Sequence, residues 1–129
     1  LYAFEIKLEK IVDSLGKPWS LSFIDSDSVI ITEKTGKLYF LNLIEKKIFN
    51  IEHNLSVLED GQGGLLDVLY DNKQIYISYS ENRGDWKSST SVAKGEFLAS
   101  SMFLNSKSVL TKILLATNFN TEGFGVTSA

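Results

Sequence analysis

The feature that most constrains the fold is a series of short β-type segments separated by turn residues. The segments are rich in Ile, Val, Tyr and Phe, and polar breaks divide them. Residues 28–33 and 37–42 flank a turn in which Gly36 can adopt the positive φ of a hairpin. Residues 46–51 follow after another polar break. The pattern therefore predicts three antiparallel strands in sequence order.

The same pattern recurs further along the chain. Residues 65–70 and 74–80 are again two strand-like runs around a turn. The run at 66–68 follows a similar run at 21–23 by 45 positions, and the run at 75–77 follows the one at 29–31 by 46. Residues 91–98 and 108–115 supply two later strands to this second unit. A period of about 40 to 50 residues with four strands is typical of a β-propeller blade.

We therefore predict an all-β fold, a β-propeller fragment of two four-stranded antiparallel blades at about 21–52 and 64–116. Both blades belong to a single partial domain covering residues 1–129. Residues 4–12 alternate apolar and charged side chains, which predicts an additional N-terminal strand that closes a propeller ring by joining its last blade. Residues 107–116 also fit helical spacing, so a helix there is the main competing interpretation.

Composition places the chain among ordinary folded domains and removes several chemistries. An apolar fraction of 43% with 22% charged residues is sufficient for a core and too apolar for disorder. The net charge is −3 and the lysines are dispersed, so we expect no nucleic-acid partner. No apolar run approaches the roughly 20 residues of a membrane span. Cysteine is absent, which excludes disulfides and Cys-based metal sites.

Residues 60–65 form the most informative polar segment. Three glycines within four positions bring the backbone close to a bulky neighbour or reverse it sharply before a strand. The spacing fits neither a dinucleotide-binding nor a phosphate-binding glycine motif. Gln62 is the only amide side chain of the segment. The residues alone favour a tight turn between blades with Gln62 exposed, and a ligand contact by Gln62 is the alternative.

Four other positions suggest chemistry or packing. His53 is the sole histidine and lies in a polar connector, which is typical of a surface residue rather than a catalytic base. Residues 25–28 hold two aspartates without the glycine and distal glutamate of a calcium loop, so we predict a polar β-turn. Trp19 is predicted to lie in the core, and a stacking platform for a planar ligand or sugar is the alternative. Trp86 is either a stacking platform for a planar ligand or sugar, or an aromatic side chain packed on its own blade.

Several stretches in register resemble a known family. The three main stretches are KPWSLSF at 17–23, ITEKTGKL at 31–38 and DGQGGLLDV at 60–68, and residues 75–80 and 91–95 extend the similarity to about residue 117. In order and spacing they are similar to the N-terminal third of the soluble glucose/sorbosone dehydrogenases, also called aldose sugar dehydrogenases, which depend on pyrroloquinoline quinone.

The resemblance implies a six-bladed propeller with pyrroloquinoline quinone at the wide end of its central channel. It also implies calcium bound to the quinone, and oxidation of aldose sugars at the anomeric carbon. Gln62 would be a cofactor-binding residue whose amide orients its ligand by hydrogen bonds, because a neutral amide cannot act as the general base. The implied location is periplasmic or secreted, although the residues themselves show no signal peptide.

The family's general base is a histidine that opens a His-Phe-Gly stretch, and the matching place here reads Gly123-Phe124-Gly125. We therefore assign no catalytic and no metal-binding residue to this chain. We expect a fragment that is inactive by itself and binds no cofactor alone. The alternative is a non-catalytic propeller-like module that binds a ligand or a protein. Exposed blade edges predict a homo-oligomer, either a threefold ring or a swapped dimer.

Overall fold

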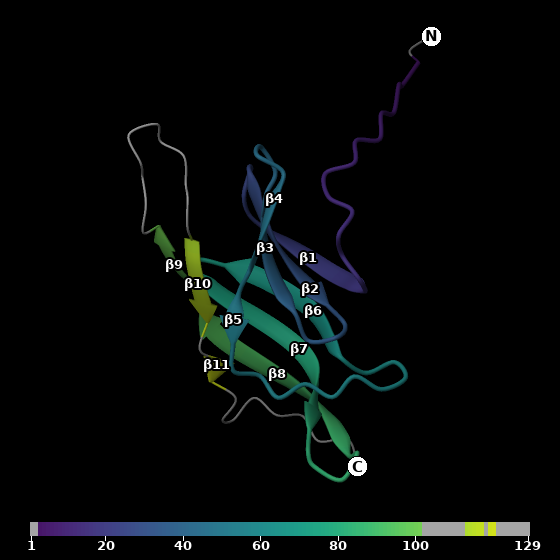
Figure 1. Ribbon diagram of the computed structural model, residues 1–129, viewed down its shortest axis with the longest axis vertical. Coiled ribbons are helices and arrows are strands. Elements are labelled where there is room, and N and C mark those ends of the chain that lie inside the picture. Colours follow the sequence, from purple (N-terminus) through teal and green to yellow (C-terminus); the bar gives the residue numbers. More distant parts are fainter. Residues whose placement is uncertain (1–2, 102–112, 118, 121–129) are drawn as a thin grey trace.

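All regular structure in the described part of the chain is β-sheet (Figure 1). The computed structural model describes residues 3–101, 113–117 and 119–120. Their strands form three sheets, of four, three and four strands. Within these ranges no helix has the length and apolarity that a membrane span requires. The all-β prediction is confirmed.

The first four-stranded sheet is blade A. It contains β1 (Pro18–Asp25), β2 (Ser28–Glu33), β3 (Leu38–Asn42) and β4 (Lys47–Asn50), in that order. Every ladder is antiparallel, so the sheet is a meander of consecutive hairpins. The hairpin turn between β2 and β3 closes through a 2.9 Å hydrogen bond from Gly36 N to Glu33 O. The strands and the hairpin predicted between residues 28 and 42 are confirmed.

The second four-stranded sheet is blade B. Its order is β11-β8-β7-β6, and its strands are β6 (Leu65–Asp71), β7 (Gln74–Asn82), β8 (Ser88–Glu96) and β11 (Phe119–Asn120). The three ladders are antiparallel, and the one between β7 and β8 is the longest, from the pair Gln74 and Glu96 to the pair Asn82 and Ser88. The first three strands of this blade agree with the predicted runs.

The fourth strand of blade B corrects the prediction. The run at 108–115 was expected to fill that place, but β10 (Ile113–Thr117) belongs to the three-stranded sheet. There it pairs antiparallel with β9 (Leu98–Ser101) and parallel with β5 (Glu52–His53). The helical alternative is wrong for the strand residues, and residues 107–112 lie outside the described residues. β-Propensity identifies a strand, whereas its partner edge depends on contacts distant in sequence.

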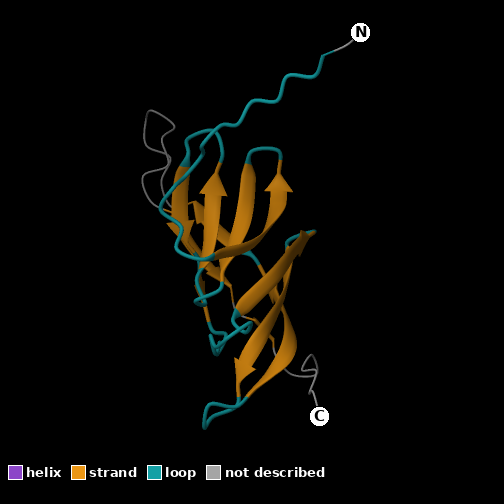
Figure 2. Cartoon of the chain, turned by 90° about the vertical axis from the view of Figure 1, so that its right-hand side faces the viewer, coloured by secondary structure: helices purple, strands orange, loops and turns teal. Residues whose placement is uncertain are grey.

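The N-terminal segment at 4–12 forms no strand within this chain. It extends away from the sheets, as both views show (Figures 1 and 2), and Phe4, Ile6 and Leu8 are almost fully exposed. Alternating apolar and charged residues form a strand only where a sheet edge pairs with them. Closure of a ring by this segment therefore stays a prediction. Its last two residues, Ile11 and Val12, pack on blade A.

The main core lies between the two blades. Its buried side chains come from β2, β3, the β4–β5 connection and the three long strands of blade B, and they are Ile30, Leu38, Ile51, Leu65, Val68, Ile75, Ile77, Tyr79 and Ala93. Phe40 stacks on Phe97, with 6.2 Å between the ring centroids. Strand β2 is buried at all its positions because blade B covers one face and the segment at 11–15 covers part of the other. Such face-to-face packing is typical of neighbouring propeller blades.

Each blade exposes apolar side chains on the face that is turned away from the other blade. On β1, Leu21 and Phe23 are exposed, and Trp19 is 51% exposed on the same face. On β6, Leu69 is exposed on the far side of blade B. The prediction that Trp19 lies in the core is wrong, because this side chain points away from the interface between the blades. A strand pattern shows which residues share a face, but it does not show whether another blade covers that face.

Candidate functional site

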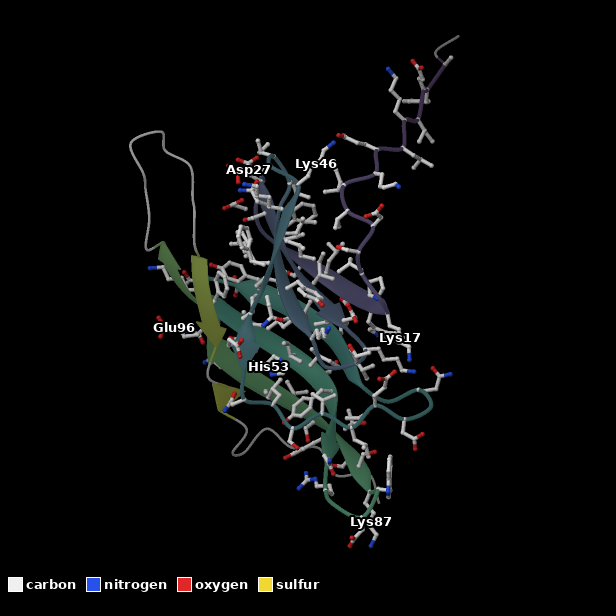
Figure 3. The ribbon with its side chains drawn as sticks, viewed as in Figure 1. Lys17, Asp27, Lys46, His53, Lys87 and Glu96 are labelled. Atoms are coloured by element: carbon white, nitrogen blue, oxygen red, sulfur yellow. The ribbon has the colours of Figure 1, made fainter. Side chains whose placement is uncertain are left out.

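One end of the two blades collects the connectors that bear the candidate residues. The ladders place the start of β1, the β2–β3 turn, the start of β6 and the β7–β8 loop at this end. The short turns after β1, β3 and β6 lie at the opposite end. Figure 3 shows the separation, with Asp27 and Lys46 at one extreme and Lys17 and Lys87 toward the other.

The glycine-rich segment forms a closed turn at this end. Gly63 N donates to Asp60 O at 2.7 Å, and Asp60 N donates back to Gly63 O at 3.3 Å. Gly61 and Gln62 are the two residues at the tip, and Gln62 is exposed. The tight turn is confirmed, as is the exposure of Gln62. Binding of a cofactor by Gln62 stays a prediction.

Close packing explains the two glycines that follow the tip. Gly64 has a φ of +157°, and a Cβ there would overlap the carbonyl oxygen of Lys34. A Cβ at Gly63 would lie 2.6 Å from Ser80 Oγ. At Gly61, in contrast, a Cβ would meet nothing within 4 Å. The base of the turn is therefore wedged between the blades, while its tip is open to an approaching molecule.

Hydrogen bonds hold the turn to both blades. From blade A, Lys34 Nζ donates to Gly61 O, and Lys34 O accepts from Leu65 N at 3.1 Å. From blade B, Ser80 N donates to Gly64 O at 2.8 Å and Ser80 Oγ accepts from Gly64 N at 3.2 Å. The sequence singled out the glycines but not Lys34 or Ser80, which lie 30 and 16 positions from Gly64. The stretches at 31–38 and 75–80 that carry the resemblance include these two residues, but nothing in them marks either residue as an anchor of the turn.

The inner strands of the blades are joined below this turn. Ser20 Oγ donates to Asp67 Oδ1 at 2.5 Å, and Tyr70 N donates to Ser22 Oγ at 2.9 Å, so β1 and β6 run side by side in the same direction. Thr32 Oγ1 donates to Leu66 O at 2.5 Å. These bonds fix blade B on blade A, and the position of the turn with Gln62 follows from them.

Both ring nitrogens of His53 make hydrogen bonds within the fold. It is partly buried in β5, and its Nε2 lies 2.6 Å from Gly36 O while its Nδ1 lies 3.1 Å from Leu55 N. Because Leu55 N–H can only donate, Nδ1 accepts and Nε2–H donates to Gly36 O. The prediction of a surface histidine is wrong, since the ring links β5 to the β2–β3 turn.

The aspartate turn at 25–28 forms as predicted, at the end opposite Gln62. Asp25 Oδ1 accepts from Asp27 N at 2.8 Å and from Ser28 Oγ at 2.9 Å. The hydrogen bond from the Asp27 backbone, and then that from Ser28, hold the pKa of Asp25 below its ordinary value. Within the described ranges, no three His, Cys, Asp or Glu side chains are grouped closely enough to bind a metal ion.

The β7–β8 loop presents Trp86 at the same end as Gln62. The indole is 81% exposed, which decides against the alternative that it packs on its own blade. Its turn closes through a 2.9 Å hydrogen bond from Lys87 N to Gly84 O. Beside it lies an open hollow of about 400 Å³, lined by Leu58, Asn82, Gly84, Asp85 and Trp86.

Two adjoining antiparallel blades, with connectors gathered at one end, define this chain as part of a β-propeller. Residues 15–125 match the family described as glucose / sorbosone dehydrogenase. The chain belongs to this family. It is 32% identical over 96 residues to the aldose sugar dehydrogenase YliI of Escherichia coli strain K12, an alignment that covers 70% of this chain and 26% of that protein.

Solved structures agree with the family and the fold. The crystal structure of the soluble aldose sugar dehydrogenase (Asd) from Escherichia coli in the apo form matches with a TM-score of 0.61 at 30% identity, over 83% of this chain and 31% of that one. The PQQ-bound aldose sugar dehydrogenase (Adh) from Streptomyces coelicolor matches in fold, with a TM-score of 0.61 at 13% identity, over 87% of this chain and 32% of that one. The chain thus spans less than a third of the length of each of these relatives.

Proposed function

We propose that this chain supplies two neighbouring blades of a quinone-dependent dehydrogenase that oxidises aldose sugars at the anomeric carbon. The family match over residues 15–125 supports the class of reaction, and the names of the relatives support aldoses as substrates. The observation that carries the proposal is the exposed amide of Gln62 on a turn that both blades hold in place. The proposed location is periplasmic or secreted, as the family resemblance implies.

The proposed role of Gln62 is to orient a ligand. Its side chain offers two N–H donors and one carbonyl acceptor, and it stays neutral, so it positions groups without moving a proton. Anchoring by Lys34 and Ser80 fixes the turn before a ligand arrives. A pre-set donor and acceptor act on a ligand without the cost of reordering the loop.

We propose pyrroloquinoline quinone and calcium as the cofactors of the complete enzyme. The quinone would accept the two electrons of sugar oxidation when bound. The open space over Gly61 and the exposed Gln62 amide fit the approach of a planar group that carries hydrogen-bonding oxygens. The described residues contribute an amide and no cluster of carboxylates, so the proposal takes the calcium ligands from other parts of the enzyme.

We also propose that this chain has no turnover by itself. The position that matches the family's general base reads Gly123, which lies outside the described residues and has no side chain to accept a proton. General-base catalysis typically contributes about 10² to 10⁴ in rate. Loss of cofactor positioning adds to that deficit.

Replacement of Gln62 in an active protein tests its role. The test protein is a fusion in which this chain replaces the corresponding part of the Escherichia coli aldose sugar dehydrogenase. We expect Gln62→Ala to lower kcat/KM for glucose about tenfold, the effect of one lost hydrogen bond to a ligand. Quinone-dependent dye reduction measures kcat/KM.

Gln74→Ala is the matched control. Gln74 is the other glutamine of the chain, and it begins β7 at the opposite end. This variant should keep the kcat/KM of the fusion. Equal kcat/KM for Gln62→Ala and the unaltered fusion, with unchanged thermal midpoints, would remove Gln62 from the site.

The second candidate function is a non-catalytic propeller-like binding module. The exposed Trp86 beside an open hollow favours this function. Such a surface can bind a ligand without catalysing a reaction. The two candidates differ in the fusion protein. A binding module would give a folded fusion that binds sugar and never reduces dye.

We propose further that the isolated chain self-associates. Blade A exposes Leu21 and Phe23, blade B exposes Leu69, and the segment at 4–12 has no strand partner within the described residues. Exposed apolar faces and an unpaired strand favour pairing with a second copy of the same chain.

A further inference from the structure

The indole of Trp86 is held out into solvent by an ordered turn. Asp85 and Trp86 have φ values of 52° and 61°, and Lys87 N donates to Gly84 O across them. This is the pattern of a type I′ turn, whose second central position strongly prefers glycine. A tryptophan there is unfavourable for the backbone, and at 81% exposure it gains little from burial. Backbone strain of this kind is a pointer to a functional site.

Several hydrogen bonds hold the loop that carries Trp86. Arg83 N donates to Lys87 O at 2.8 Å, and Gly84 N donates to Asn82 Oδ1 at 2.8 Å. Arg83 Nε donates to Ser89 Oγ at 2.8 Å, and Arg83 Nη2 lies 3.1 Å from Glu81 Oε2. The aromatic face is therefore positioned in advance, which reduces the entropic cost of binding.

The hollow beside Trp86 has the size and chemistry of a small-ligand site. Its volume of about 400 Å³ falls within the range of roughly 300 to 1,000 Å³ that is usual for such sites. Of the described residues that line it, Asp85 is the only charged one, and Asn82 and Leu58 are neutral. An exposed carboxylate accepts hydrogen bonds from hydroxyl groups and repels an anion. An aromatic face with adjacent polar groups suits the apolar face of a pyranose ring.

We propose that Trp86, Asp85 and Asn82 form a carbohydrate subsite for a neutral pyranose unit. The assignment of a sugar as the ligand rests on the proposed function. The hollow lies at the same end as Gln62, and Leu58 belongs to the connector that leads into the glycine-rich turn. The subsite thus holds a sugar unit other than the one at the reacting centre.

Indole resonances of the chain test the subsite directly. The chain has two tryptophans, so a ¹H–¹⁵N spectrum resolves one indole N–H signal from Trp19 and one from Trp86. Maltose should shift the Trp86 signal saturably and leave the Trp19 signal in place. Sorbitol, which has the hydroxyls without a ring face, should shift neither signal. Pyrroloquinoline quinone in a separate titration tests a planar anionic ligand at the same indole.

Three variants complete the test. Trp86→Gly should raise the Kd for maltose about tenfold by removing the stacking face, and Trp86→Phe should keep it within about threefold. Lys73→Gly is the matched control. Asn72 and Lys73 form a turn at the opposite end, and both have positive φ values, 47° and 68°, as Asp85 and Trp86 do. It should leave the Kd unchanged.

The outcomes separate the subsite from the proposed function. An unmoved Trp86 signal with maltose, an equal shift with sorbitol, a shift with the quinone alone, or an unchanged Kd in Trp86→Gly would each overturn the subsite. None of these results bears on the oxidation of glucose in the fusion protein. Conversely, a fusion protein without turnover would overturn the proposed function. The result of the maltose titration would not be affected.

Discussion

At the scale of single residues, Gly64 carries the clearest structural requirement. A side chain there would overlap Lys34 O, and its φ of +157° already disfavours one. We expect Gly64→Ala to lower the free energy of unfolding by about 2 kcal/mol or more, since the blades must separate to admit the methyl group. Urea denaturation measures the change.

Gly61→Ala is the matched control for that substitution. Its Cβ meets open space, so only the positive φ of +55° opposes it, at about 1 kcal/mol. A larger loss for Gly61→Ala than for Gly64→Ala would mean that the turn is not wedged between the blades.

The carboxyl group of Asp25 gives a pH-dependent prediction. Hydrogen bonds to the charged form lower its pKa below 3.8 in the folded chain. Its contribution to stability is therefore complete above the unfolded-state pKa and is lost as pH falls through the folded-state pKa. An NMR titration should give a pKa under 3.8, and Ser28→Ala should raise it by removing one donor. A pKa of 3.8 or higher in the unaltered chain would contradict the turn geometry.

At the scale of elements, two hairpins of blade B have a non-glycine residue at the second central position of a turn with two positive φ values. These residues are Lys73 and Trp86, with φ values of 68° and 61°. Trp86→Gly and Lys73→Gly should each raise the free energy of unfolding by up to about 1 kcal/mol, because glycine adopts this conformation without the steric cost. Lower urea midpoints in both variants would show that the turns are not left-handed.

Local turn chemistry made several elements predictable from the sequence. The β2–β3 hairpin follows from a strand pair around Gly36, and the turn at 60–63 follows from its glycines. The partner of β10 was not predictable, because a strand-like run does not specify which distant edge it joins. The partial burial of His53 was not predictable either, because its ring contacts Gly36 O, 17 positions away, and no local sequence pattern indicates such a contact.

The candidate site was predictable in part. The glycine spacing and the resemblance identified Gln62, and its position in a loop identified Trp86 as a possible platform. The sequence could not show that Lys34 and Ser80 hold the Gln62 turn, since both contacts cross between segments distant in sequence. Nor could it show that Trp19 is exposed, because that depends on which surface faces β1.

At the scale of the whole molecule, the uncovered faces predict association of the isolated chain. One hollow on blade A is lined by Leu15, Pro18, Trp19, Ser20, Leu21 and Ile31. Blade B exposes a second hollow around Leu69 and Tyr76. The mass of one chain is 14.4 kDa. At a protein concentration of about tens of micromolar, sedimentation equilibrium should therefore report a larger mass.

A substitution in the N-terminal segment tests whether that association uses strand exchange. Ile6→Pro removes a backbone donor from an exposed segment outside the core, so it should weaken association without unfolding the blades. Ile6→Val keeps the donor and should associate as the unaltered chain does. A single 14.4 kDa species in the unaltered chain would show that self-association does not occur.

We propose that this chain forms two blades of a quinone-dependent sugar dehydrogenase. The most direct measurement is glucose-dependent dye reduction by the fusion protein and by the isolated chain, both supplied with pyrroloquinoline quinone and calcium. We predict quinone-dependent turnover in the fusion and none in the isolated chain. A fusion that folds as a stable propeller yet never reduces dye would contradict the claim.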